Sequence, residues 1–147
     1  MRDSGYIRDG RSPIPKTPIT SRTMSANKAK NTRPEIKLRK GLRAVGLSDY
    51  KLHPKNLPGR PDVVFPGRKL AIFVNGCFWH RCPHCKPKNP KTHSKFWETK
   101  FQNNIERDKR NIRTLRRAGW RVNTIWECRL RKNEVGEIKK IERSYFS

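Results

Sequence analysis

The chain has 147 residues, enough for one domain with a modest core. Its 36 Lys and Arg residues outnumber 12 Asp and Glu residues, which gives a net charge of +24. No run of about 18 apolar residues occurs, so we expect no membrane span. This charge suits a nucleic acid, because basic side chains release counterions when they bind phosphates. A solubilising surface and an acidic membrane are the alternatives.

Residues 1–30 are rich in Ser, Pro, Thr, Arg and Lys, with seven basic and two acidic residues. This composition predicts a flexible basic N-terminal arm, which either follows a phosphate backbone or is an unstructured tail. Met24 is an alternative start. We expect the folded domain to span residues 31–147. The start of the chain shows no hydrophobic signal core, which favours a cytoplasmic protein with reduced cysteines.

The folded part is expected to begin with a helix. Thr32 and Glu35 form a capping-box pattern, and a proline between them is tolerated in the first turn. Gly46 marks the end of this helix. Its apolar residues at roughly helical spacing are Ile36, Leu38, Leu42 and Val45.

Strands are expected next. Tyr50 to His53 is a short candidate, and Asp62 to Phe65 pairs with Lys69 to Val74 through a turn at 66–68. The strand at 69–74 is apolar on both faces, which indicates a central, covered position in the sheet.

The remaining elements complete an α/β pattern. A cysteine-rich loop is expected to His93, then a long helix from Phe96 to Ala118, a strand from Trp120 to Trp126 and a short helix from Glu134 to Ile141. The order predicts an α/β sandwich around a mixed sheet. The long helix is expected to face inward with Trp97, Phe101, Ile105, Ile112 and Leu115. The last strand is expected to carry Val122, Thr124 and Trp126 on one face.

The four cysteines predict a structural zinc site. Cys77, Cys82 and Cys85 have the spacing C-x4-C-x2-C, and Cys128 follows the last strand. Four thiolates bind zinc tetrahedrally, and the ion would stabilise a loop with few apolar residues of its own. His84 could replace Cys85 as a ligand, and four unrelated free thiols are the alternative.

Two residues near the strand ends could perform hydrolysis. Asp62, at a strand start, could hold Mg²⁺ for phosphodiester cleavage, or it could simply cap a turn. His80 could transfer a proton, or it could lie beside the zinc or at the surface.

Aromatic residues follow the first cysteine. Phe78 and Trp79 lie in a polar loop, and with Trp97 they could enter a base stack or pack over the zinc loop. Capping explains Glu35, and a solvated helix face explains Asp108.

Taken together, the motifs resemble the very-short-patch mismatch repair endonucleases. The Gly-Cys-Phe-Trp-His string, with Arg-Pro-Asp upstream and Trp-Glu-Cys downstream, is highly specific, and the similarity runs collinearly from residue 28 to about 131. The matching segments are residues 31–35, 57–62, 72–80, 96–97, 104–108, 119–122 and 126–128.

This resemblance implies a restriction-endonuclease-like fold and a Mg²⁺-dependent nick 5′ to the thymine of a T·G mismatch left by 5-methylcytosine deamination. It implies that Asp62 and the Val74 carbonyl bind the metal and that His80 is catalytic. Glu35 and Asp108 match acidic residues that hold water or orient the histidine. Phe78, Trp79 and Trp97 match an aromatic wedge that enters the DNA.

Two positions depart from the family pattern. Asn75 stands where a histidine usually precedes Gly-Cys-Phe-Trp-His, and an amide can orient water but cannot carry a proton. The zinc loop reads Cys-Pro-His-Cys, which leaves Cys85 and His84 both open as ligands.

We therefore expect a monomeric, nucleoid-associated DNA endonuclease. Its expected partners are double-stranded DNA with a T·G mismatch, mismatch-repair proteins and a cognate cytosine methyltransferase. A restriction or mobile-element endonuclease of the same fold and a non-catalytic zinc DNA-binding module are the alternatives.

Overall fold

A computed structural model describes residues 31–147 of the chain. The predicted N-terminal arm, residues 1–30, lies outside the described residues. Within 31–147, no helix is long and apolar enough to cross a membrane.

The first described helix, α2 (Arg33–Ala44), begins at the predicted capping pattern. Thr32 Oγ1 accepts a hydrogen bond from the Glu35 amide at 3.4 Å, and the Glu35 carboxylate accepts one from the Asn31 amide at 3.1 Å. Leu38 and Leu42 are fully buried. Val45, the last of the apolar residues at helical spacing, follows the final helical residue and is 42% exposed.

The sheet is mixed, as predicted. It has four strands in the order β1-β2-β3-β4, in which β2 pairs antiparallel with both β1 and β3, and β3 pairs parallel with β4. Because β3 pairs on both edges and is covered on both faces, its apolar run is explained. The bounds are β1 Lys51–Leu52, β2 Val63–Phe65, β3 Leu70–Asn75 and β4 Arg121–Trp126, with a 3-10 turn, η1, at Pro66–Arg68.

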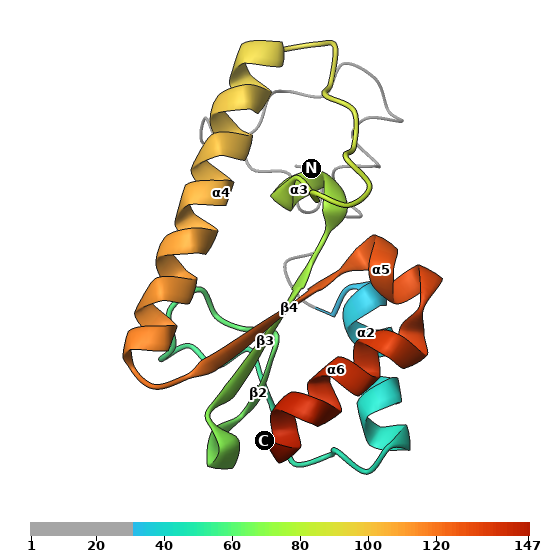
Figure 1. The fold of residues 1–147 in the computed structure, drawn as a ribbon. Helices are drawn as coiled ribbons and strands as arrows, with labels where there is room; N and C mark the ends of the chain where they lie inside the picture. The colour runs from blue at the N-terminus through green and yellow to red at the C-terminus, as the bar shows by residue number, and fades with distance from the viewer. Residues whose placement is uncertain (1–30) are drawn as a thin grey trace, which may run out of the picture.

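Helix α4 (Ser94–Arg117) connects the parallel strands β3 and β4, and it lies along one side of the sheet (Figure 1). Leu115 is fully buried there against Val64 and Ala71. Asn104, a polar residue, is buried on this helix, whereas the predicted Ile105 and Ile112 are only half-buried. The polar position is explained below by its contact with α3.

The opposite face of the sheet is covered by α2, α5 (Glu127–Lys132) and α6 (Glu134–Phe146), which completes three α/β/α layers (Figure 1). Helix α5 was not predicted, and α6 runs five residues beyond the expected end at Ile141. Ile125 of β4 is buried in this second layer, so β4 contributes apolar contacts on both faces. The helices supply Leu38, Leu42, Leu130, Ile138 and Ile141 to this core.

The segment after β3 was expected to be a loop, but the structure shows that part of it is helical. It begins with a one-turn helix, α3 (Cys77–His80), which ends at Arg81 in the left-handed region. Parallel pairing of β3 with β4 places Asn75 opposite Trp126. The residues that follow each strand, Cys77 and Cys128, therefore lie at the same edge of the sheet.

Candidate functional site

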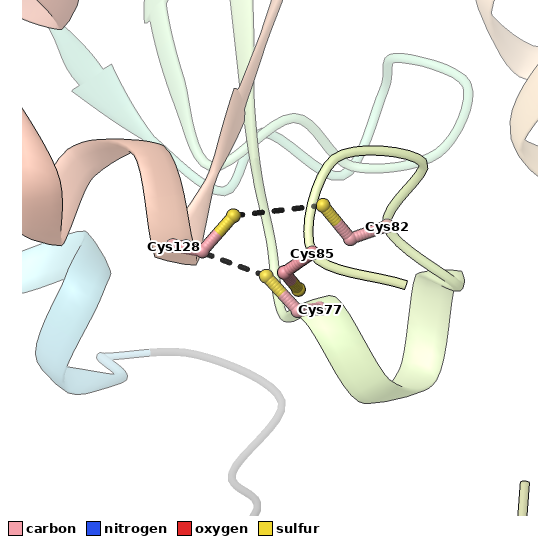
Figure 2. A group of neighbouring side chains, drawn as sticks. All are labelled: Cys77, Cys82, Cys85 and Cys128. Atoms are coloured by element: carbon pink, nitrogen blue, oxygen red, sulfur yellow. Dashed lines mark hydrogen bonds between the residues drawn. The ribbon is translucent and has the colours of Figure 1, made fainter. Parts of the chain in front are cut away.

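The four cysteines meet at this edge. The sulfur atoms of Cys77, Cys82, Cys85 and Cys128 all lie within 4.8 Å of one another, and all four thiols are free (Figure 2). Cys82 Sγ is 3.6 Å from Cys128 Sγ, and Cys77 Sγ accepts a hydrogen bond from the Cys128 amide at 3.3 Å. Four converging sulfurs fit the donor set of a structural zinc.

The structure places Cys85 rather than His84 in this cluster. Cys85 Sγ is one of the four converging sulfurs, although the residue is exposed. The His84 ring instead lies edge-on to Trp126, with ring centroids 6.4 Å apart, while its amide donates to Cys82 Sγ. His84 therefore contributes a backbone contact to the cluster.

Without a bound metal, Cys77 and Cys128 favour the protonated thiol over the thiolate. Burial raises the pKa of the Cys77 and Cys128 thiols, because a thiolate loses solvation there. A cation that binds these sulfurs must displace protons, so its affinity falls as the pH falls.

A second group forms beside the start of β2. Asp62 donates its amide to the Ile72 carbonyl at 3.0 Å, and its carboxylate Oδ2 accepts from the Val74 amide at 2.6 Å. Burial raises the pKa of Asp62 to about 7; the Val74 amide opposes the shift and the neighbouring Glu35 adds to it. Asp62 is thus held at the edge of the sheet as a partly desolvated carboxylate, whose ionisation is unfavourable in the folded protein.

Glu35 is brought to Asp62 from the first helix. Its side chain is 1% exposed, and Oε2 lies 2.7 Å from Arg39 NH1. Glu35, His53 and Asp62 each offer a ligand atom within 4.8 Å of the others. Glu35 was expected to cap the helix and, by the family resemblance, to belong to the catalytic site. His53 was expected only as part of a strand, and its place beside Glu35 and Asp62 is visible only in the structure.

His80 and Asp108 form a close pair. His80 Nδ1 lies 2.6 Å from Asp108 Oδ2, which joins α3 to α4. An Nδ1–H held by a carboxylate leaves Nε2 as the ring nitrogen available for proton transfer. A charged His80 would lower the pKa of Asp62, so the two lie in one electrostatic neighbourhood. Asn75 is buried at the end of β3.

The aromatic residues form one packed group at this end. Phe78 lies edge-on to Trp79, Trp97 and Phe101, with centroids 5.0, 5.6 and 5.2 Å apart. Trp97 is buried, whereas Phe78 and Trp79 are half-buried. The buried Asn104 donates to the Trp79 carbonyl at 3.0 Å, which fixes α3 on α4.

Several known proteins are similar in sequence to this chain over most of its length. The family model for DNA mismatch endonuclease Vsr matches residues 16–86. The type II nicking enzyme V.XorIIP of Xanthomonas oryzae is 43% identical over 116 residues, which cover 79% of this chain and 83% of the relative. DNA mismatch endonuclease Vsr of Escherichia coli is 42% identical over 115 residues, which cover 78% and 72%. The chain belongs to the Vsr endonuclease family.

Membership of the Vsr family confirms the resemblance drawn from the Gly-Cys-Phe-Trp-His string and its flanking motifs. The Vsr relatives carry two kinds of name. V.NaeI of Lentzea aerocolonigenes, 39% identical over 80% of this chain and 73% of its own length, is also called a type II nicking enzyme. The relatives therefore include both a DNA mismatch endonuclease and type II nicking enzymes.

Proposed function

We propose that this protein nicks one DNA strand 5′ to the thymine of a T·G mismatch that arises from deamination of 5-methylcytosine. The observation that carries the proposal is the convergence of Asp62, Glu35 and the His80–Asp108 pair at one edge of the sheet. Family membership supports a nuclease. The three layers agree with a restriction-endonuclease-like fold, which we propose for this chain.

A divalent cation fits the carboxylate site. Asp62 and Glu35 repel each other there, and a buried ring nitrogen of His53 faces both without a hydrogen bond. We propose that Asp62 and the Val74 carbonyl hold Mg²⁺, with Glu35 beside them. When bound, such an ion stabilises the negative charge that develops on the scissile phosphate.

His80 is proposed to transfer a proton at Nε2, while Asp108 orients the ring through Nδ1. Asn75 cannot take over this role, since its amide only donates and accepts hydrogen bonds. Of Asn75 and His80, His80 is therefore the residue proposed to transfer the proton.

Replacing His80 by alanine should lower the nicking rate by about 10²–10⁴-fold, the usual contribution of a general acid or base. Asp108→Asn should cost less, because the ring remains and only its orientation is weakened. Single-turnover nicking of a labelled duplex measures both rates. An unchanged rate in His80→Ala would remove His80 from the mechanism.

We propose that Phe78, Trp79 and Trp97 act as the wedge at the mismatch. Phe78 and Trp79 are half-buried, so they retain surface that a base pair could contact, and Trp97 supports them from α4. Unstacking a base step costs a few kcal/mol and is easier at a mismatch. The net charge of +24 supplies binding that does not depend on sequence.

The experiment that tests this function compares a T·G duplex with a matched duplex in Mg²⁺. We expect a single nick in the thymine strand of the mismatched duplex and none in the matched one. Phe78→Ala combined with Trp79→Ala should cost more binding affinity on the T·G duplex.

Two outcomes would change the proposal. Cleavage of matched duplexes at a fixed sequence would indicate a nicking enzyme with another target, in line with the names of V.XorIIP and V.NaeI. Equal affinity losses on both duplexes would mean that the aromatic residues only pack α3 against α4.

A further inference from the structure

His53 faces the carboxylate site but is not among the metal ligands proposed above. We propose that it is a nitrogen ligand of the catalytic metal site, and that it makes this site bind Mn²⁺ in preference to Mg²⁺. The inference rests on the proposed function in one respect, namely that the site at Asp62 holds a divalent cation.

The geometry around the His53 ring points to a cation. Nε2 lies 2.7 Å from Glu35 Oε2 and 3.8 Å from Asp62 Oδ1. Within residues 31–147, Nε2 is a buried nitrogen without a hydrogen-bond partner, because its close contact with Glu35 lacks hydrogen-bond geometry. Buried polar atoms are normally satisfied, so this one calls for a partner that the protein itself does not supply.

The backbone holds the ring in this position. His53 directly follows β1, and its amide donates to the Asp62 carbonyl at 3.4 Å. Its φ is +46°, in the left-handed region that few residues other than glycine adopt. With the backbone in this conformation, the imidazole lies within 3.8 Å of an oxygen atom of each carboxylate.

The other contacts of Asp62 and Glu35 leave one oxygen atom of each carboxylate facing His53, where a metal ion can bind. Asp62 uses Oδ2 for the Val74 amide, and its Oδ1 faces His53. Glu35 accepts from the Asn31 amide at Oε1, and its Oε2 contacts both Arg39 and His53. A carboxylate oxygen has two lone pairs, so Oε2 can retain Arg39 and still bind a cation.

This donor set differs from a magnesium site made only of oxygen atoms. Mg²⁺ prefers carboxylate, phosphate and water oxygens, whereas imidazole nitrogen favours first-row transition ions. A site with two carboxylates and one imidazole therefore gains affinity for Mn²⁺ through His53, and little for Mg²⁺.

Pulsed electron paramagnetic resonance of Mn²⁺ bound to the zinc-loaded full-length protein tests the assignment directly. The wild type should show the ¹⁴N modulation of a coordinated imidazole. His53→Gln should remove it, while His80→Gln and His93→Gln should retain it, the last being an exposed histidine before α4. Absence of the modulation in the wild type, or its persistence in His53→Gln, would overturn the proposal.

Metal titrations of the same proteins supply a second readout. His53→Gln should weaken Mn²⁺ binding by about tenfold or more, since removing even a residue that supports a ligand costs about 10–100-fold. Mg²⁺ affinity should hardly change, and the matched His93→Gln protein should behave as the wild type. Equal losses for both ions would mean that His53 only positions Glu35. Nicking of T·G DNA by the wild type remains a separate test of the proposed function.

Discussion

Replacing Asp62 by asparagine is expected to abolish nicking and, at the same time, to stabilise the protein in the absence of added Mg²⁺. Activity should be lost because the amide carries no charge to hold the cation beside the scissile phosphate. Stability should rise because the folded protein holds the Asp62 carboxylate in a desolvated position beside Glu35, which raises its pKa to about 7.

The sign of the effect follows from the two pKa values. Below about pH 4 the Asp62 carboxyl is protonated in both the folded and the unfolded chain and contributes nothing. Between about pH 4 and 7 only the unfolded chain loses this proton, so wild-type stability falls as the pH rises. The variant lacks this loss, and its advantage reaches a plateau above pH 7 at roughly 4 kcal/mol or less.

Thermal or urea unfolding of zinc-loaded wild type and Asp62→Asn at pH 4, 5.5 and 8 measures this difference. Glu142→Gln on α6 is a suitable control, since it removes a carboxylate outside the group formed by Glu35, His53 and Asp62. A variant that nicks T·G DNA at the wild-type rate would refute the site assignment. A stability difference that is the same at all three pH values would refute the desolvation argument.

Loss of the cysteine cluster is expected to have the largest effect on the fold. We propose one structural zinc bound by Cys77, Cys82, Cys85 and Cys128. Zinc sites of this kind contribute about 10–16 kcal/mol in small domains, as much as the whole stability of a typical protein. Cys128→Ser should therefore prevent tight zinc binding and release the α3 segment from β4.

A pair of variants separates the two candidate ligands. Cys85→Ser should weaken zinc binding by more than about 100-fold, beyond the loss seen for residues that only support a ligand. His84→Ala should retain zinc, because its ring faces Trp126 and not the sulfurs. Elemental analysis after dialysis against a chelator measures both, and folded wild-type protein without zinc would contradict the site.

Local chemistry explains what could be predicted from the sequence. The capping pattern at Thr32 and Glu35, the apolar run of β3 and the helical spacing in α4 each depend on neighbours along the chain, so they are visible without the fold. The structure departs from the expected pattern where packing decides. Ile105 and Ile112 are only half-buried, while the polar Asn104 is buried because it binds the Trp79 carbonyl.

The sequence by itself determined which residue types were available to this protein: four thiols at ligand spacing, a carboxylate at a strand start and a histidine after an aromatic pair. Only the tertiary structure decided which of them meet. Parallel pairing of β3 with β4 brings Cys128 to Cys77, and packing of α2 on the sheet brings Glu35 to Asp62. The left-handed backbone at His53 adds a ring that no spacing rule indicated. These contacts join residues far apart along the chain, and periodicity carries no information about such distances.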